Sequence, residues 1–171
     1  MHAFKYCPNC KSDNFKFPDQ RRFECHDCGM IFYQNIAAAV GIIIEHKEKL
    51  LFTIRNKNPR KGYLDLPGGF TDPNETAEET CARELKEELN IKIAPQRFKY
   101  FTSRPNIYEF KDFSYKTEDL IFTAEFPVET TVELEAEEIQ AIKWIDRSEI
   151  DITKIAFKSL QSAVKAYLKE R

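Results

Sequence analysis

Four cysteines, arranged in two pairs, constrain the N-terminal part of the chain more than any other feature. Two residues separate Cys7 from Cys10 and Cys25 from Cys28, and residues 11–24 lie between the two pairs. Two thiolates at this spacing can hold one ion from a tight turn, and two such turns complete a tetrahedral zinc site. Because four protein ligands leave no open position, this zinc would be structural. Two disulfides or free thiols are the alternative.

Composition divides the chain soon after the last of these cysteines. Residues 1–34 contain few aliphatic residues, so we expect a zinc ribbon that cannot build a core of its own. Residues 35–171 are expected to form the second domain. His26, inside the second cysteine pair, could replace a cysteine as a ligand or lie on the surface. Cys81 is expected to be either a small buried thiol or a reactive one.

Net charge and apolar content exclude some classes of protein. The chain carries a net charge of −2 at pH 7, which does not support a strongly basic nucleic-acid binder. No apolar run approaches the roughly 20 residues of a membrane span. The first ten residues, MHAFKYCPNC, lack the apolar segment of a signal peptide. We therefore expect a cytoplasmic protein that binds neither a membrane nor nucleic acid. The reducing cytoplasm favours zinc over disulfides at the four cysteines.

The pattern of the second domain predicts strands mixed with two helices. The expected strands are at 36–44, 50–55, 92–103, 118–126 and 139–145. The first two should form a hairpin. Loops are expected at 56–69 and, rich in aromatic residues, at 104–117, and a C-terminal amphipathic helix is expected at 155–168. Such a mixture indicates an α/β or α+β domain.

The other helix is expected at residues 76–89. Thr76 followed by Glu79 has the form of a capping box, which predicts the helix N-terminus. At 3.6 residues per turn, Cys81, Leu85 and Leu89 share one side of this helix. That side is apolar and is expected to face the core.

An adjacent side of the same helix concentrates negative charge. Glu84, Glu87 and Glu88 are three and four residues apart, so they lie on one face and repel one another. A hard divalent cation would relieve this repulsion, because carboxylate oxygens are its preferred ligands. A plain solvated acidic face is the alternative. The preceding LPGGF segment can turn sharply and approach a ligand closely. Arg83 is placed to pair with Glu75 and brace this loop, and an exposed arginine is the alternative.

From Gly69 to Ile91 the sequence resembles the Nudix box, Gly-x5-Glu-x7-Arg-Glu-U-x-Glu-Glu-x-Gly-U, where U is aliphatic. The matching residues are Gly69, Glu75, Arg83, Glu84, Leu85, Glu87, Glu88 and Ile91. Asn90 replaces the last glycine, and Asn is the next most tolerant residue for a left-handed helix C-cap. The resemblance implies that the second domain is a Nudix α/β/α sandwich with a mixed sheet.

The resemblance also implies a reaction and its ions. Nudix enzymes hydrolyse a nucleoside diphosphate linked to another moiety. Glu84, Glu87 and Glu88 are then expected to bind catalytic Mg2+ or Mn2+, with the Gly68 carbonyl as a further ligand. Glu84 is a candidate general base, and Glu87 is counted with it in the catalytic set.

A glutamate outside the box is expected to complete the catalytic set. Glu138 lies six residues before Trp144, a spacing that resembles the equivalent segment of zinc-bearing NADH pyrophosphatases. Glu137, its neighbour, would face the other way on a strand. A surface charge is the alternative for Glu138.

The four-cysteine ribbon ahead of the box resembles the NADH pyrophosphatase branch of the family. Those enzymes carry a Ser-Gln-Pro-Trp type motif, whereas residues 103–106 here read Ser-Arg-Pro-Asn, so only Ser and Pro match. The expected substrate-binding residues are Arg55, Ser103, Arg104 and Tyr108. The aromatic residues that follow the motif could stack on a base, or pack as core or dimer contacts: Tyr108, Phe110, Phe113 and Tyr115. The branch implies a homodimer.

Three functions remain after these arguments. The first is metal-dependent hydrolysis of the pyrophosphate linkage in a nucleotide substrate, such as NADH, NAD or ADP-ribose. The second is a catalytically inactive ligand sensor or nucleic-acid-binding regulator. The third is hydrolysis of capped RNA, which uses the same pyrophosphate chemistry. Since the chain keeps every box glutamate, the sequence favours catalysis over sensing.

Overall fold

The computed structural model describes residues 4–111, 113–127 and 131–170. The chain folds into two compact units, Met1–Ile36 and Ala37–Arg171. The expected division lay between residues 34 and 35. Within the described residues, neither α-helix has the length and apolar character that a membrane crossing requires.

The first unit is a small antiparallel sheet with little core. Its strands, in the order β1-β2-β3, are β1 (Phe15–Lys16), β2 (Arg22–Cys25) and β3 (Ile31–Tyr33). Phe23 is buried with Cys7 and Cys25, and the partly buried residues around them are Phe4, Phe15, Phe17 and Met30. So small a core gives little stability by itself, and a unit of this size ordinarily needs a cross-link or a metal.

The four cysteine sulfurs of this unit lie together. All four are within 4.8 Å of one another. Cys7 Sγ is 3.7 Å from Cys28 Sγ, and Cys10 Sγ is 3.6 Å from Cys25 Sγ. A disulfide requires about 2.05 Å, whereas zinc–sulfur bonds of about 2.3 Å place tetrahedral sulfurs about 3.8 Å apart. His26 is exposed. The separations suit the predicted zinc site formed by the four cysteines.

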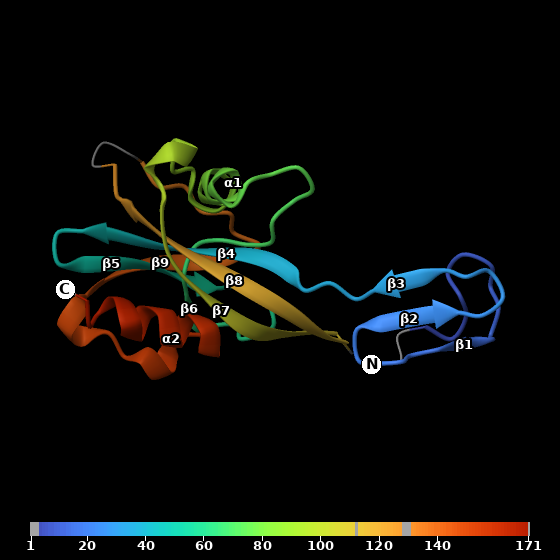
Figure 1. Ribbon diagram of the computed structural model, residues 1–171. Coiled ribbons are helices and arrows are strands. Elements are labelled where there is room, and N and C mark those ends of the chain that lie inside the picture. Colours follow the sequence, from blue (N-terminus) through green and yellow to red (C-terminus); the bar gives the residue numbers. More distant parts are fainter. Residues whose placement is uncertain (1–3, 112, 128–130, 171) are drawn as a thin grey trace. The chain divides into compact units, whose positions relative to one another are not determined.

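The second unit is a six-stranded mixed sheet between two helices (Figure 1). The strands are β4 (Ala37–His46), β5 (Lys49–Arg55), β6 (Leu64–Asp65), β7 (Lys99–Phe110), β8 (Phe113–Glu125) and β9 (Ile139–Asp146). They lie in the order β6-β5-β4-β8-β7, and β9 pairs with β5. β4 and β8 run parallel, and the remaining pairs are antiparallel.

The helices cover opposite faces of this sheet (Figure 1). The α-helices are α1 (Ala77–Leu89) and α2 (Lys158–Tyr167), and the short 3-10 turns are η1 (Pro95–Arg97), η2 (Arg147–Glu149) and η3 (Ile152–Lys154). Side chains alternate along a strand, so Ile42 and Ile44 of β4 pack in the α1 cluster while Ile43 packs in the α2 cluster. This arrangement is the predicted α/β/α sandwich, and burial on both faces explains the continuous apolar run of β4.

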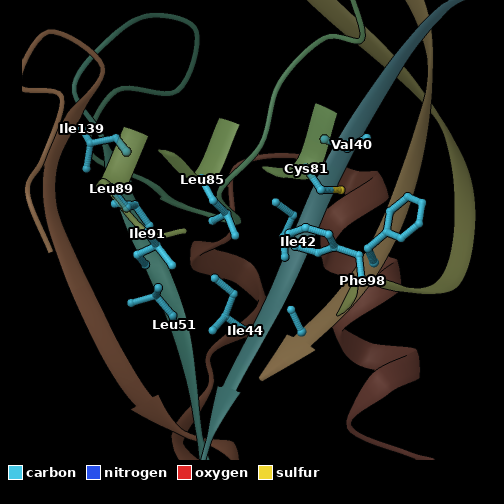
Figure 2. Close-up of a cluster of buried hydrophobic side chains, with 12 residues drawn as sticks. Val40, Ile42, Ile44, Leu51, Cys81, Leu85, Leu89, Ile91, Phe98 and Ile139 are labelled. Carbon is cyan, nitrogen blue, oxygen red and sulfur yellow. The ribbon is translucent and has the colours of Figure 1, made fainter. Parts of the chain in front are cut away.

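The apolar side of α1 faces the sheet as predicted. Figure 2 shows Cys81, Leu85 and Leu89 directed toward Ile42 and Leu51 of the two central strands. All five side chains are fully buried. Burial raises the pKa of the Cys81 thiol, so this cysteine packs as a small apolar side chain rather than a reactive one.

Both predicted ends of α1 are confirmed. The Thr76 hydroxyl accepts from the Glu79 N–H at 3.2 Å, and the Glu79 carboxylate accepts from the Thr76 N–H at 2.8 Å. These two bonds form the capping box. Asn90 ends the helix at φ 54°, in the left-handed conformation that the family motif assigns to glycine.

The expected aromatic loop at 104–117 is wrong. These residues belong to a long hairpin in which β7 and β8 pair from Lys99–Thr123 to Phe110–Phe113. Pro105 suggested a loop, but β7 is an edge strand, where a missing N–H can face away from the ladder. Three smaller differences accompany this one. The first part of the expected strand 92–103 is η1, the loop 56–69 contains β6, and the C-terminal helix is shorter than expected.

The zinc site leads to a stability prediction. Cys7→Ser removes one of four ligands, so we expect the first unit to lose most of its amide protection against hydrogen exchange. Structural zinc contributes on the order of 10 kcal/mol to folding in small domains. The second unit should keep its protection, because its core is separate. Exchange measured by mass spectrometry on the full chain tests this, with His26→Asn, an exposed position between Cys25 and Cys28, as the control. Unchanged exchange in Cys7→Ser would count against a structural metal.

Candidate active site

A cavity of about 460 Å³ opens in the second unit. Its wall combines the loop before α1, the acidic side of α1, the ends of β4 and β5, the β7–β8 hairpin and the start of α2. The volume falls within the range of small-molecule sites. Five of the predicted catalytic or metal-binding residues line it: Gly68, Glu84, Glu87, Glu88 and Glu138.

The loop of residues 67–70 lies directly against β4. The Val40 N–H donates to the Gly69 carbonyl at 2.8 Å, and the Ile42 N–H donates to the Pro67 carbonyl at 2.9 Å. Gly68 has φ 143°, and a Cβ there would overlap the Val40 carbonyl oxygen. A Cβ at Gly69 would overlap the carboxylate of Glu84. Each glycine is therefore required for a different reason, one by the strand and the other by the acidic helix.

The three box glutamates differ in their surroundings. Burial raises the pKa of Glu84, and it raises the pKa of Glu88 well above the usual range. The Gly68 N–H donates to Glu88 Oε2 at 3.1 Å, which fixes this carboxylate beneath the loop. The Glu87 side chain is 58% exposed and lies at the rim. Among the described residues, the cysteines alone gather their ligand atoms within 4.8 Å, so the three glutamates face one cavity without converging so closely.

Arg83 joins the loop to the helix. Its Nε and Nη2 donate to the two carboxylate oxygens of Glu75, at 2.8 and 3.0 Å. Its Nη1 donates to Glu84 at 2.8 Å and to Glu87 at 3.1 Å, and Nη2 also donates to the Phe70 carbonyl at 3.0 Å. The Arg83 guanidinium lowers the pKa of Glu75 to about 2. The Arg83 side chain thus orients Glu84 and Glu87, and it anchors the loop through Glu75.

The floor of the cavity contains an ion pair that the sequence did not predict. Arg55, an expected substrate-binding residue, pairs with the buried Asp65 through Nη1 and donates from Nε to the Pro59 carbonyl at 2.8 Å. Its guanidinium carbon lies 5.0 Å from the centre of the Phe157 ring. Its Nη2 is buried and has no hydrogen-bond partner among the described residues. Asp65 was missed because β6, two residues long, lies inside a segment read as loop.

Apart from Tyr108, the wall opposite the acidic helix was also missed. It is formed by residues on one face of the hairpin, Asn106, Tyr108, Thr117 and Asp119, together with Phe157 at the start of α2. In the sequence these hairpin positions are two residues apart, which is a strand pattern. Pro105 and the aromatic residues interspersed among these positions favoured a loop, so the alternation was not recognised.

Of the remaining predicted residues, some line the cavity and others do not. Tyr108 lines the cavity, and Glu138 does so with an ion pair to Lys57. Ser103 and Arg104 are not among the described residues that line it. Arg104 instead donates to the Ser162 hydroxyl of α2 at 3.2 Å and to the Ser103 carbonyl at 2.7 Å. The neighbouring Glu137 is likewise absent from the lining.

The low pKa of Glu75 gives a pH-dependent prediction. Its folded value of about 2 lies below the value of about 4.3 expected in the unfolded chain. The stability that ionised Glu75 contributes is therefore complete above about pH 4.3 and disappears as the pH falls through about 2. We expect Glu75→Gln to lower the melting temperature at pH 7, with a difference from wild type that shrinks across this window. Thermal unfolding between pH 2 and 7 measures it. Glu78→Gln, on the same helix but outside these contacts, is the control. A pH-independent difference would contradict the argument.

Comparison with protein families gives one match over most of the chain. The model of the NUDIX domain family matches residues 35–164 of this chain. Among curated proteins, the NAD-capped RNA hydrolase NudC of Chromobacterium violaceum is 29% identical over 105 residues, which are 61% of this chain and 39% of that protein. The ADP-ribose pyrophosphatase of Methanocaldococcus jannaschii is 48% identical over 59 residues, which are 34% of this chain and 35% of that protein. The matches thus span well under half the length of these relatives.

Solved structures agree with the family match. A NUDIX hydrolase from Nitrosomonas europaea superposes with a TM-score of 0.74 at 27% identity, and the alignment covers 98% of this chain and 92% of that one. The NUDIX domain of Shewanella oneidensis NrtR, complexed with ADP ribose, superposes with a TM-score of 0.62 at 20% identity, covering 81% and 91%, and shows the fold alone. Since the family match spans most of the chain and includes every residue that lines the cavity, the chain belongs to the NUDIX domain family.

Proposed function

We propose that the protein hydrolyses the pyrophosphate linkage of a nucleoside diphosphate derivative with the help of a divalent cation. The observation that carries this proposal is the pair of partly buried carboxylates, Glu84 and Glu88, that faces the cavity beside the glycine loop. Buried like charges are unfavourable unless a positive charge compensates them. Arg83 reaches Glu84 and Glu87, but none of its described contacts is with Glu88.

The donor set suits a hard cation. Carboxylate and carbonyl oxygens are the ligands that Mg2+ and Mn2+ prefer. The missing Cβ of Gly69 leaves space for the Glu84 carboxylate. The residues that would hold Mg2+ or Mn2+ are Glu84, Glu87, Glu88 and the Gly68 carbonyl. When bound, the cation would neutralise charge on the pyrophosphate oxygens and activate the attacking water.

The chain's own groups supply the other requirements of hydrolysis. The buried Nη2 of Arg55 is a donor without a described partner at the cavity wall, so it is suited to a phosphate oxygen. Lys57 adds a second positive charge at the same cavity. Glu84 or Glu138 takes the proton of the attacking water at a carboxylate oxygen. The capping box and the Arg83 contacts hold the acidic helix in place throughout.

The proposed substrate is a dinucleotide such as NADH or NAD, or ADP-ribose. Two supports favour this class over nucleoside triphosphates: the named activities of the relatives from C. violaceum and M. jannaschii, and the aromatic wall of the cavity. Tyr108 and Phe157, with ring centres 5.7 Å apart, offer apolar surface for a flat ring.

A substrate panel tests the proposed function. The full chain is incubated with Mg2+ or Mn2+ and with NADH, NAD, ADP-ribose, FAD, diadenosine polyphosphates or nucleoside triphosphates. Products are separated by chromatography. We expect cleavage of a dinucleotide or of ADP-ribose to a nucleoside monophosphate, and no cleavage in EDTA. If no compound were cleaved with either ion, the alternative of a ligand sensor would replace the enzyme.

A single substitution tests the acidic helix. Glu87→Gln removes one charge at the rim of the cavity, where the side chain is exposed and its loss leaves the core intact. We expect the turnover number to fall on the order of 10²-fold or more, with an unchanged melting temperature. The matched control is Glu78→Gln, an isosteric change on the same helix away from the cavity, which should retain turnover. Full activity in Glu87→Gln would remove this residue from the site.

A further inference from the structure

Asp119 is a buried acid that the proposed chemistry does not use. It lies on β8, is 7% exposed, and lines the cavity on the wall opposite the acidic helix. Its Oδ1 accepts from the Thr117 hydroxyl at 2.8 Å, and its Oδ2 accepts from the Ser159 hydroxyl at 2.5 Å. Both neighbours donate, so the carboxylate serves as an acceptor.

The acceptor capacity of Asp119 is only partly used. An ionised carboxylate offers about four lone-pair directions, and the two hydroxyls and the Asn106 amide leave about one of them open. No ion pair among the described residues includes Asp119, whereas Asp65 on the same cavity has Arg55. A buried carboxylate without a cationic partner is stabilised by additional N–H or O–H donors. Because Asp119 borders the cavity, a ligand can supply such a donor.

The surroundings of Asp119 select the shape of that ligand. Phe157 and Tyr108 line the same wall, their ring centres 5.7 Å apart and their planes tilted by 40°. Phe70 meets Tyr108 edge-on, with ring centres 5.7 Å apart. Asn106, paired with Thr117 across the hairpin, adds an amide to the wall. Aromatic surface beside a lone acceptor suits a flat heteroaromatic ring that carries an amino group.

We propose that Asp119 recognises the ring of the substrate by accepting an N–H from an exocyclic –NH2 group, while Tyr108 and Phe157 contact the ring face. This proposal rests on the proposed function, because it deepens the description of the same cavity. The amino group belongs to adenine or to the carboxamide of nicotinamide, and both present the same donor chemistry.

A purely structural role for Asp119 gives a different expectation. Ser159 lies in the first turn of α2, and Phe157, the N-cap residue, makes no side-chain cap bond. The Ser159–Asp119 bond therefore also anchors the helix. If that were the whole role, Ser159→Ala and Asp119→Asn would weaken the protein alike, and neither would alter ligand preference.

Binding of mononucleotides tests the proposal without requiring turnover. Calorimetry on the full chain with Mg2+ compares AMP with IMP, in which oxygen replaces the adenine amino group, and nicotinamide mononucleotide with nicotinic acid mononucleotide. We expect a preference of at least about tenfold for the amino form in one of the two pairs. The pair that shows it identifies the ring.

The variants then assign the preference to Asp119. Asp119→Asn presents N–H donors to the oxo or carboxylate analogue, so the preference should fall to about threefold or less. Ser159→Ala removes the helix anchor but leaves the acid in the cavity, so it should keep the wild-type preference. Equal affinities within both pairs for wild type, or a preference that persists in Asp119→Asn, would overturn the proposal. An intact preference in a chain that hydrolyses none of the panel would instead overturn the proposed function alone.

Discussion

The close approach of the glycine loop to β4 is the constraint on which the site depends. β4 and β5 pair at their turn and then diverge, and residues 67–70 occupy the neighbouring position along β4. The loop can lie there only because Gly68 has no side chain to meet the Val40 carbonyl. From this position its backbone fixes Glu88, and Gly69 leaves room for Glu84. The strand, the loop and the acidic helix therefore determine one another's places.

The acidic helix is stable despite its repulsions because other terms are larger. Like charges three or four residues apart weaken a helix by a few tenths of a kcal/mol per pair. A helix cap such as that at Thr76 contributes about 1 kcal/mol, and full burial of Leu85 and Leu89 contributes roughly 1.5–3 kcal/mol each. Arg83 offsets part of the remaining repulsion. The fold can thus hold carboxylates close together for chemistry without losing the helix that carries them.

Local signals in the sequence predicted much of this structure. The capping box, the C-cap at Asn90, the first hairpin and the gathering of the four cysteines each follow from residues near one another in the chain. Asp65 and Asp119 were missed, because their roles depend on partners brought by the fold, Arg55 in one case and Ser159 in the other. Residues 104–117 of the hairpin were read as a loop, since Pro105 is acceptable only in an edge strand, and edge position is a property of the whole sheet.

The alternation along β4 has a consequence for how such a protein can change. Neighbouring residues of this strand belong to separate apolar clusters, one beneath α1 and the other beneath α2. Substitutions in separate clusters add independently where the sites lie well apart and share no partners. The side of the sheet that carries the aromatic wall can therefore diversify while the side that carries the glutamates stays constant. One scaffold of this kind can give rise to relatives that share the acidic helix and bind different ligands.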